Sequence, residues 1–151
     1  MSSKLTGSWR ELKLFTQNFG ADVQQESKKY MNNTSEEIKQ AIQDTINLQT
    51  EPWVALKHDT VQRKGSSIKL KETGDLVNSI DVTSLGANKY VISPQGQHNS
   101  GLSNSEIALI HEYGTEKVPP RPFIQPVYEE YENEVPNDME KIISKTIKKY
   151  I

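Results

Sequence analysis

The chain has 151 residues, a length typical of one domain, and its charge is nearly balanced, with 18 Lys and Arg against 20 Asp and Glu. It has no cysteine, which excludes a disulfide scaffold, a thiolate zinc site and a cysteine nucleophile. The sequence has no strongly basic footprint, no signal-peptide-like apolar run and no stretch near the roughly 18–20 apolar residues that span a bilayer. We therefore expect no sequence-specific nucleic acid and no membrane among its partners, and folding in a cytoplasm.

The first predicted element is a helical region over residues 8–49. Ser8 is placed to cap a short helix, and Gly20 is expected to break or bend the chain. Apolar residues then recur at three- and four-residue steps, which predicts a stripe that packs against the domain's own sheet or against a partner helix. Because Ser35 and two following glutamates also resemble a helix start, either one long helix with a weak centre or two abutting helices would fit.

An antiparallel hairpin is predicted next. Residues 78–84 alternate apolar and polar side chains, residues 89–93 are rich in β-formers, and a turn-like connection lies between them. Residues 94–104 are nearly all turn formers, which predicts a flexible loop.

Two more helices are predicted after this loop. Ser105 opens a short helix that Gly114 ends, and three prolines hold residues 118–123 extended. A C-terminal helix covers residues 126–150, with a kink or a break expected at Pro136.

The order of these elements predicts one domain over residues 1–151. Its class is α+β, with a small antiparallel β-sheet packed by the long N-terminal helical region and the C-terminal helix. The lysines between residues 141 and 149 fit a solvated helix end or, as an alternative, a basic helix on a membrane surface.

No catalytic, cofactor-binding or metal site is predicted. His111 and Glu112 begin a pattern typical of zinc proteases, but the second histidine would have to replace Thr115. Neighbouring carboxylates such as Glu36 and Glu37 do not face each other on a helix, so they form no acid–base pair. No Walker loop, dinucleotide-binding glycine motif or nucleophile elbow occurs in the sequence.

One short basic segment permits two interpretations. Residues 64–67 (KGSS) have the composition of a phosphate-cradling loop, although such loops are commonplace. Arg63 and Lys64 are interpreted instead as solubilising charges or as contacts to an acidic partner surface.

Three stretches within about residues 53–127 carry a resemblance to a known family. They are Trp53–Leu56 followed by Arg63–Gly65, then Thr73–Ile80, and finally Ile107–Thr115 with Val118–Ile124. In this order they resemble the virion-morphogenesis and tail-completion family of tailed bacteriophages. In that family a TG-L-SI turn leads into a β-hairpin, and a His-Glu-Tyr-Gly helix end precedes a P-x-RPF segment and a closing helix. The chain departs from the family in its long polar loop at 94–104.

The motif residues are interpreted as fold-determining. They are Thr73, Gly74, Leu76, Ser79, Ile80, His111, Tyr113, Gly114, Arg121, Pro122 and Phe123. Gly74 would allow a turn with positive φ, Gly114 would cap a helix, and Tyr113 would act as an aromatic plug. Arg121, held between prolines, is expected to pair with a carboxylate of its own fold or of a neighbouring subunit.

The resemblance implies a role in assembly. Proteins of this kind complete the tail or join it to the head in the neck of the virion. The expected partners are the tail terminator, tail tube and head connector proteins, and the chain itself is expected to form a homo-oligomeric ring. The expected docking residues are Gln95, Gln97, His98, Asn99, Leu102 and Arg121. Two alternatives are another connector component, such as an adaptor, stopper or tail terminator, and a small hydrolase or nuclease with a cryptic site.

Overall fold

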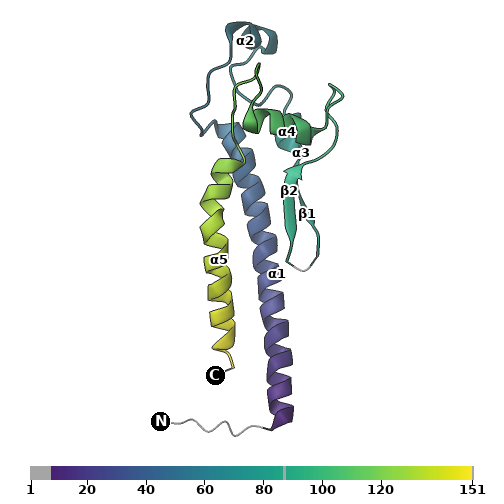
Figure 1. Cartoon of the computed structure of the whole chain (residues 1–151), viewed down its shortest axis with the longest axis vertical. Helices are drawn as coiled ribbons and strands as arrows, with labels where there is room; N and C mark the ends of the chain where they lie inside the picture. Colours follow the sequence, from purple (N-terminus) through teal and green to yellow (C-terminus); the bar gives the residue numbers. More distant parts are fainter. Residues whose placement is uncertain (1–7, 87, 151) are drawn as a thin grey trace.

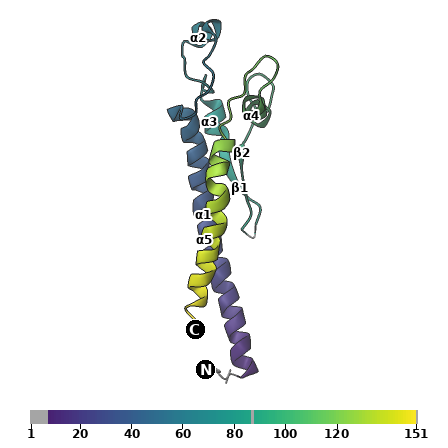
Figure 2. The same cartoon turned by 60° about the vertical axis from the view of Figure 1, so that its left-hand side comes forward.

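The computed structural model of the chain describes residues 8–86 and 88–150 (Figure 1). In chain order the elements are α1 (Trp9–Leu48), α2 (His58–Lys64), α3 (Asp75–Ser79), β1 (Ile80–Ser84), β2 (Tyr90–Pro94), α4 (Asn104–Tyr113) and α5 (Gln125–Ile147). The two long helices lie side by side, and the hairpin and short helices gather around the end where α1 finishes and α5 starts (Figures 1 and 2). The predicted α+β class is confirmed.

α1 is one uninterrupted helix of 40 residues. Ser8 caps it as predicted, in a capping box with Glu11. The predicted break at Gly20 is wrong, because one exposed glycine costs a helix only about 1 kcal/mol, which packing against α5 offsets. Ser35 does not start a helix either, since its buried hydroxyl donates to the carbonyl oxygen of Asn32 at 2.8 Å, one turn earlier.

α5 continues through Pro136, so the predicted break there is also wrong. A proline inside a helix leaves one carbonyl of the preceding turn without its N–H donor. Pro136 lies on the exposed side of α5, where water can reach that carbonyl. The helix also ends at Ile147, a few residues before the predicted end.

Where α1 runs along α5, the most deeply buried side chains are small and polar. They are Ser27 and Thr34 on α1 and Thr146 on α5. Tyr30 donates to a carboxylate oxygen of Asp138 at 3.3 Å, and Tyr150 donates to Asp22 at 2.8 Å. Small buried side chains and hydrogen bonds therefore contribute to the contact between the two helices.

The hydrophobic core occupies one end of the molecule, which we call the head (residues 38–131). The buried apolar residues are Ile42, Ile46, Trp53, Leu76, Val77, Ile80, Ala108, Phe123 and Val127. They come from the end of α1, from α3, β1 and α4, from the start of α5, and from the connecting segments that contain Trp53 and Phe123. Among the described residues, no buried apolar side chain precedes Ile42, so most of α1 lies outside the core.

The hairpin is antiparallel, as predicted, and pairs Ile80 with Pro94 at one end and Ser84 with Tyr90 at the other. Strand β1 starts at Ile80 because the preceding residues, 75–79, form α3. Within the described part of the chain the sheet has these two strands alone. A two-stranded hairpin is marginal in water, so its packing on α1 matters for its stability.

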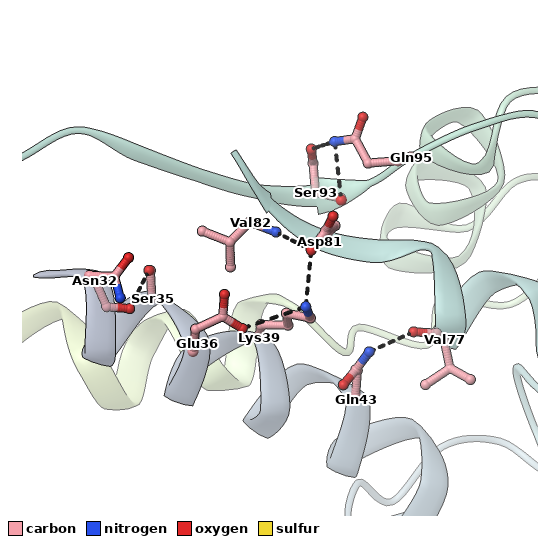
Figure 3. Close-up of polar contacts among 10 residues, drawn as sticks. All are labelled: Asn32, Ser35, Glu36, Lys39, Gln43, Val77, Asp81, Val82, Ser93 and Gln95. Carbon is pink, nitrogen blue, oxygen red and sulfur yellow. Dashed lines mark hydrogen bonds and ion pairs between the residues drawn. The ribbon is translucent and has the colours of Figure 1, made fainter. Parts of the chain in front are cut away.

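Polar contacts join α1 to this hairpin (Figure 3). The ammonium group of Lys39 lies 2.9 Å from a carboxylate oxygen of Asp81 and 3.5 Å from one of Glu36. One turn further on, the side-chain amide of Gln43 donates to the carbonyl oxygen of Val77 at 3.0 Å. The first contact joins β1 to α1, and the second joins α1 to α3, the short helix that leads into β1.

The loop at 94–104 is closed by its own hydrogen bonds. The amide of His98 donates to the carbonyl of Leu102 at 2.8 Å, and the side chain of Asn104 donates to the carbonyl of Gln95 at 2.7 Å. Ser103, and not Ser105 as predicted, caps α4. The loop predicted as flexible therefore has a defined hairpin-like shape next to the end of β2.

Candidate functional site

The stretches that carry the family resemblance meet in the head. The indole N–H of Trp53 donates to the carbonyl oxygen of Pro122 at 2.8 Å, and Phe123 is fully buried next to this pair. The amide of Arg121 donates to the carbonyl oxygen of His111 at the end of α4. Residues far apart in sequence thus fix one another's backbone, as expected of fold-determining residues.

Glu112 makes the densest set of contacts in this group. Its carboxylate accepts from the backbone amides of Phe123, Ile124 and Gln125 at 2.9, 3.1 and 2.8 Å. These amides lead into α5: Gln125 is its first residue, and Phe123 precedes the N-cap residue, Ile124, which supplies no side-chain cap. In the sequence, Glu112 stands out only as part of an incomplete zinc motif, which does not reveal this role. A helix start without its own Ser, Thr, Asp or Asn is the signal that could have pointed to a distant carboxylate.

Gly114 ends α4 as predicted. Its backbone has φ +74° and ψ 178°, and its amide donates to the carbonyl of Ile110 at 2.9 Å. A Cβ atom at this position would lie 2.8 Å from the nitrogen of Pro120 and 2.9 Å from the carbonyl oxygen of Val118. Only glycine fits there without a backbone shift.

The Thr73–Ile80 stretch also behaves as predicted. Gly74 has φ +92°, and the hydroxyl of Thr73 accepts from the amide of Asp75 at 3.3 Å. The hydroxyl of Ser79 donates to the carbonyl of Leu76 at 2.7 Å, and both Leu76 and Ile80 are buried. Tyr113 differs from its prediction, because its side chain is 76% exposed and plugs nothing within the described chain.

The predicted docking residues separate into two groups. Gln95, Gln97, Asn99 and Leu102 are exposed on the 94–104 loop, and His98 is half-buried. Arg121 is not on this surface: it is only 5% exposed, and its guanidinium contacts the carbonyl oxygen of Val54 through two nitrogens at 3.4 Å.

The expected carboxylate partner of Arg121 is missing from its own fold. Within the described chain, no Asp or Glu oxygen lies within 4 Å of the guanidinium. An internal ion pair for Arg121, one of the two roles predicted for it, is therefore wrong. The prolines place its side chain inward instead, toward the segment that follows Trp53.

Arg121 lines a cavity of about 400 Å³ in the head, between the segment after Trp53, α2, α4 and the 117–121 segment. Its cationic lining residues are Lys57, Arg63, Lys64, Lys117 and Arg121, and its carboxylates are Glu72 and Asp75. Its large apolar lining residues are Val54, Leu56, Leu70, Leu76, Ile107 and Val118. His98 and His111 complete the polar part of the wall, so the structure brings His98 and Arg121 to one site while the rest of the predicted interface stays on the outer surface.

The electrostatics of this cavity are those of crowded, partly desolvated cations. The pKa of His111 is lowered to about 4, chiefly by burial and in addition by the positive charges of Arg121 and Lys64. Burial also lowers the pKa of Lys64 and of Arg121. His111 is therefore neutral at pH 7, and its buried Nδ1 atom has no hydrogen-bond partner in the described chain.

One of the cavity's cationic side chains already has a carboxylate partner. Arg63 lies 2.8 Å from a carboxylate oxygen of Glu72, and the imidazole of His98 lies 3.9 Å from an oxygen of Asp75. Arg121 is left with neutral contacts only. Chemically, the arrangement is suited to holding an anion by charge and hydrogen bonds.

A second hollow of about 440 Å³ lies between α1, β2 and α5 and is mostly apolar. It is lined by Met31, Ile38, Ile42, Ile92, Ile124, Tyr128, Tyr131, Glu132, Val135 and Pro136. Over residues 8–86 and 88–150, no group of three or more His, Asp or Glu side chains is placed to hold a metal ion. In the same ranges, no helix has the length and apolar character needed to cross a membrane.

Comparison with known proteins gives one relative. No protein-family model and no solved structure matches the chain. An uncharacterized protein of Methanocaldococcus jannaschii is 31% identical to it over 99 residues, an alignment that covers 62% of this chain and 69% of the relative. At this identity and coverage, the chain belongs to the same family as that archaeal protein.

Proposed function

We propose that the chain is a structural protein of tailed bacteriophages that completes the tail, or joins the tail to the head in the neck, through protein–protein contacts. The motif order within residues 53–127 motivates this assignment to a virion. The name of the archaeal relative states no activity, so the remaining support comes from the shape and surface of the molecule.

The observation that supports an assembly role is that the chain exposes more surface than a compact monomer of its mass. The chain exposes 10744 Å² for a mass of 17.1 kDa, whereas a compact monomer of that mass exposes about 7,800 Å². The nine residues outside the described ranges can account for at most about 1,500 Å² of the difference, at the area per residue of an unfolded chain. The remaining excess, about a fifth, reflects the long helices that extend beyond the core (Figure 2). A protein of this shape is suited to being enclosed by neighbours.

The sheet offers a way to join copies into a ring. Strands β1 and β2 pair with each other, and the outer edge of each is unpaired within the described chain. Such edges template pairing with another chain. Repeated contacts between two different surfaces of each copy close into a ring when the rotation between copies allows it. The apolar hollow beside β2 lies next to one of these edges and adds area for such a contact.

Binding to purified phage particles tests this role. The full chain is incubated separately with isolated tails and with filled, tailless heads, and each mixture is separated by velocity sedimentation. We expect co-sedimentation with tails for a tail-completion protein and with heads for a connector component. If the protein co-sediments with neither, the neck assignment is wrong.

A pair of variants tests the involvement of the sheet edge. Val91→Lys places a charge on β2, which should weaken binding and lower the solution mass of any ring. Leu85→Lys makes the same change at another exposed apolar residue, just after β1 has ended, and should leave both unchanged. Equal effects of the two variants would show that pairing at the β2 edge does not drive assembly.

A further inference from the structure

We propose that the cavity beside Arg121 is a binding site for one carboxylate of a partner protein, carried by an acidic side chain with apolar neighbours. The inference concerns the chemistry of the site and does not rest on the phage role proposed above.

A buried guanidinium without a counter-ion is costly. Arg121 is 95% removed from solvent, and its bonds within the described chain are two long contacts of 3.4 Å to one carbonyl oxygen. Arginine carries five N–H donors in a planar fork that matches a carboxylate, so most of its bonding capacity is unused. Burial penalises charged groups unless an opposite charge pairs with them. A carboxylate entering the cavity would supply that charge.

The surrounding groups favour the same ligand. Nδ1 of His111 is buried, has no partner in the described chain and belongs to a lining residue of the same cavity. Lys64 and Lys117 also line it, and the ammonium of Lys64 has only the carbonyl of Ile68 as a partner, at 2.9 Å. Five cationic side chains face two carboxylates in this wall, and one of those carboxylates, Glu72, is paired with Arg63. The cavity therefore has a surplus of positive charge.

The rest of the wall selects a carboxylate on an apolar chain over phosphate. Leucine, isoleucine and valine side chains form much of the lining, which suits the body of a peptide better than a fully hydrated anion. The volume, about 400 Å³, is within the range of sites that enclose small ligands or the tip of a peptide.

The test uses a matched pair of peptides, acetyl-Leu-Glu-Leu-amide and acetyl-Leu-Gln-Leu-amide, which differ only in the carboxylate. Each is titrated into the full chain while NMR records the Arg121 Nε–H and His111 ring signals; inorganic phosphate is titrated in parallel. We expect saturable shifts of both signals with the glutamate peptide, at least about tenfold weaker binding of the glutamine peptide, and weaker binding of phosphate.

Variants locate the binding. Arg121→Gln should abolish the shifts of the His111 ring. Because Arg121 is buried and its replacement can unfold the head, Lys117→Gln at the exposed rim provides a second test that should weaken binding several-fold. Lys29→Gln removes the same charge from an exposed position on α1 outside the cavity and should have no effect. Equal affinity for the two peptides, tighter binding of phosphate, or equal effects of Lys117→Gln and Lys29→Gln would each overturn the proposal.

Discussion

At the level of single residues, Gly114 is the glycine whose replacement by any other residue would disturb the backbone most. Its positive φ is strained for any other residue, and a Cβ atom would approach the backbone at Pro120 and Val118 to within 2.9 Å. We predict that Gly114→Ala lowers the free energy of unfolding by about 2–4 kcal/mol, the combined cost of strained backbone and overpacking. Urea unfolding followed by circular dichroism measures this change.

A substitution at a second glycine separates the cost of the strained backbone from the cost of overpacking. Gly65 also has a positive φ, +67°, but nothing lies within 4 Å of where its Cβ would be. Gly65→Ala should therefore cost only about 1 kcal/mol, from the backbone alone. If the two variants lose the same stability, the close approach at Gly114 has no energetic consequence.

A second prediction at this scale concerns pH and His111. Its pKa is lowered to about 4 in the folded chain, chiefly by burial and then by Arg121 and Lys64, against about 6.5 when unfolded. Between these values the unfolded chain binds the proton more strongly, so stability is highest above pH 6.5 and falls as the pH drops toward 4. The loss reaches about 3 kcal/mol when complete. Unfolding midpoints measured from pH 7.5 to 4.5 follow it.

The variant His111→Gln isolates this contribution from the other titrating groups. The carboxylates of Asp81, Glu106 and Asp138 have lowered pKa values, so their protonation in acid also lowers the stability of the fold. This loss is the same in the wild-type chain and in the variant. The wild-type chain should lose more stability than the variant between pH 6.5 and 4.5. Parallel pH curves for the two proteins would contradict a neutral, buried His111.

At the level of elements, the start of α5 depends on a side chain from α4. Three consecutive amides, from Phe123 to the first residue of α5, donate to the carboxylate of Glu112, which also places a negative charge at the positive end of the helix. We predict that Glu112→Gln, which keeps the size but removes the charge and one acceptor oxygen, lowers the free energy of unfolding by about 1–3 kcal/mol. Thermal and urea unfolding measure the loss.

The control for this prediction is Glu116→Gln. Glu116 is exposed three residues after α4 has ended, and its side chain makes no hydrogen bond or ion pair within the described chain. Its substitution should change stability by less than about 0.5 kcal/mol. A similar loss for both variants would indicate a general effect of charge and not the capping of α5.

The sequence correctly predicts that the long elements are helices, but the breaks that it suggests within them are absent. The apolar stripes identify the α1 and α5 regions, and the alternation identifies the hairpin. Gly20 and Pro136 mislead because their local cost is a few kcal/mol at most, which the packing of a helix over many turns can exceed. The short helices α2 and α3 are missed because they have too few residues to show a periodicity.

The candidate site was only partly predictable for a different reason. Motif order indicates that Trp53, Gly114 and Phe123 matter, but one sequence does not say which backbone groups they contact. Arg121 looks like a presented side chain because prolines flank it, yet its direction depends on where Trp53 and Val54 lie in the fold. The cavity gathers residues from distant parts of the chain, so only the tertiary structure reveals it.

At the scale of the whole molecule, stability is unevenly distributed. All buried apolar residues in the described ranges belong to the head, whereas the first part of α1 is held mainly by contacts of Phe15 and Phe19 with Tyr150. The ring centroids in these two contacts are 5.4 and 6.0 Å apart. Aromatic pairs of this kind contribute about 0.5–1.5 kcal/mol each, far less than a core. Local opening should therefore start at this end of the helix pair.

Hydrogen exchange tests this gradient along a single helix. We predict that amides in residues 13–26 of α1 exchange at least about a hundredfold faster than those in residues 38–48, because opening the former breaks few apolar contacts while opening the latter disrupts the head. Tyr150→Leu should accelerate exchange in the first segment only, since it removes both aromatic contacts and the hydrogen bond to Asp22. Uniform protection along α1 would mean that the two helices and the head unfold as one unit, and the long pair would then be a rigid arm even without a partner.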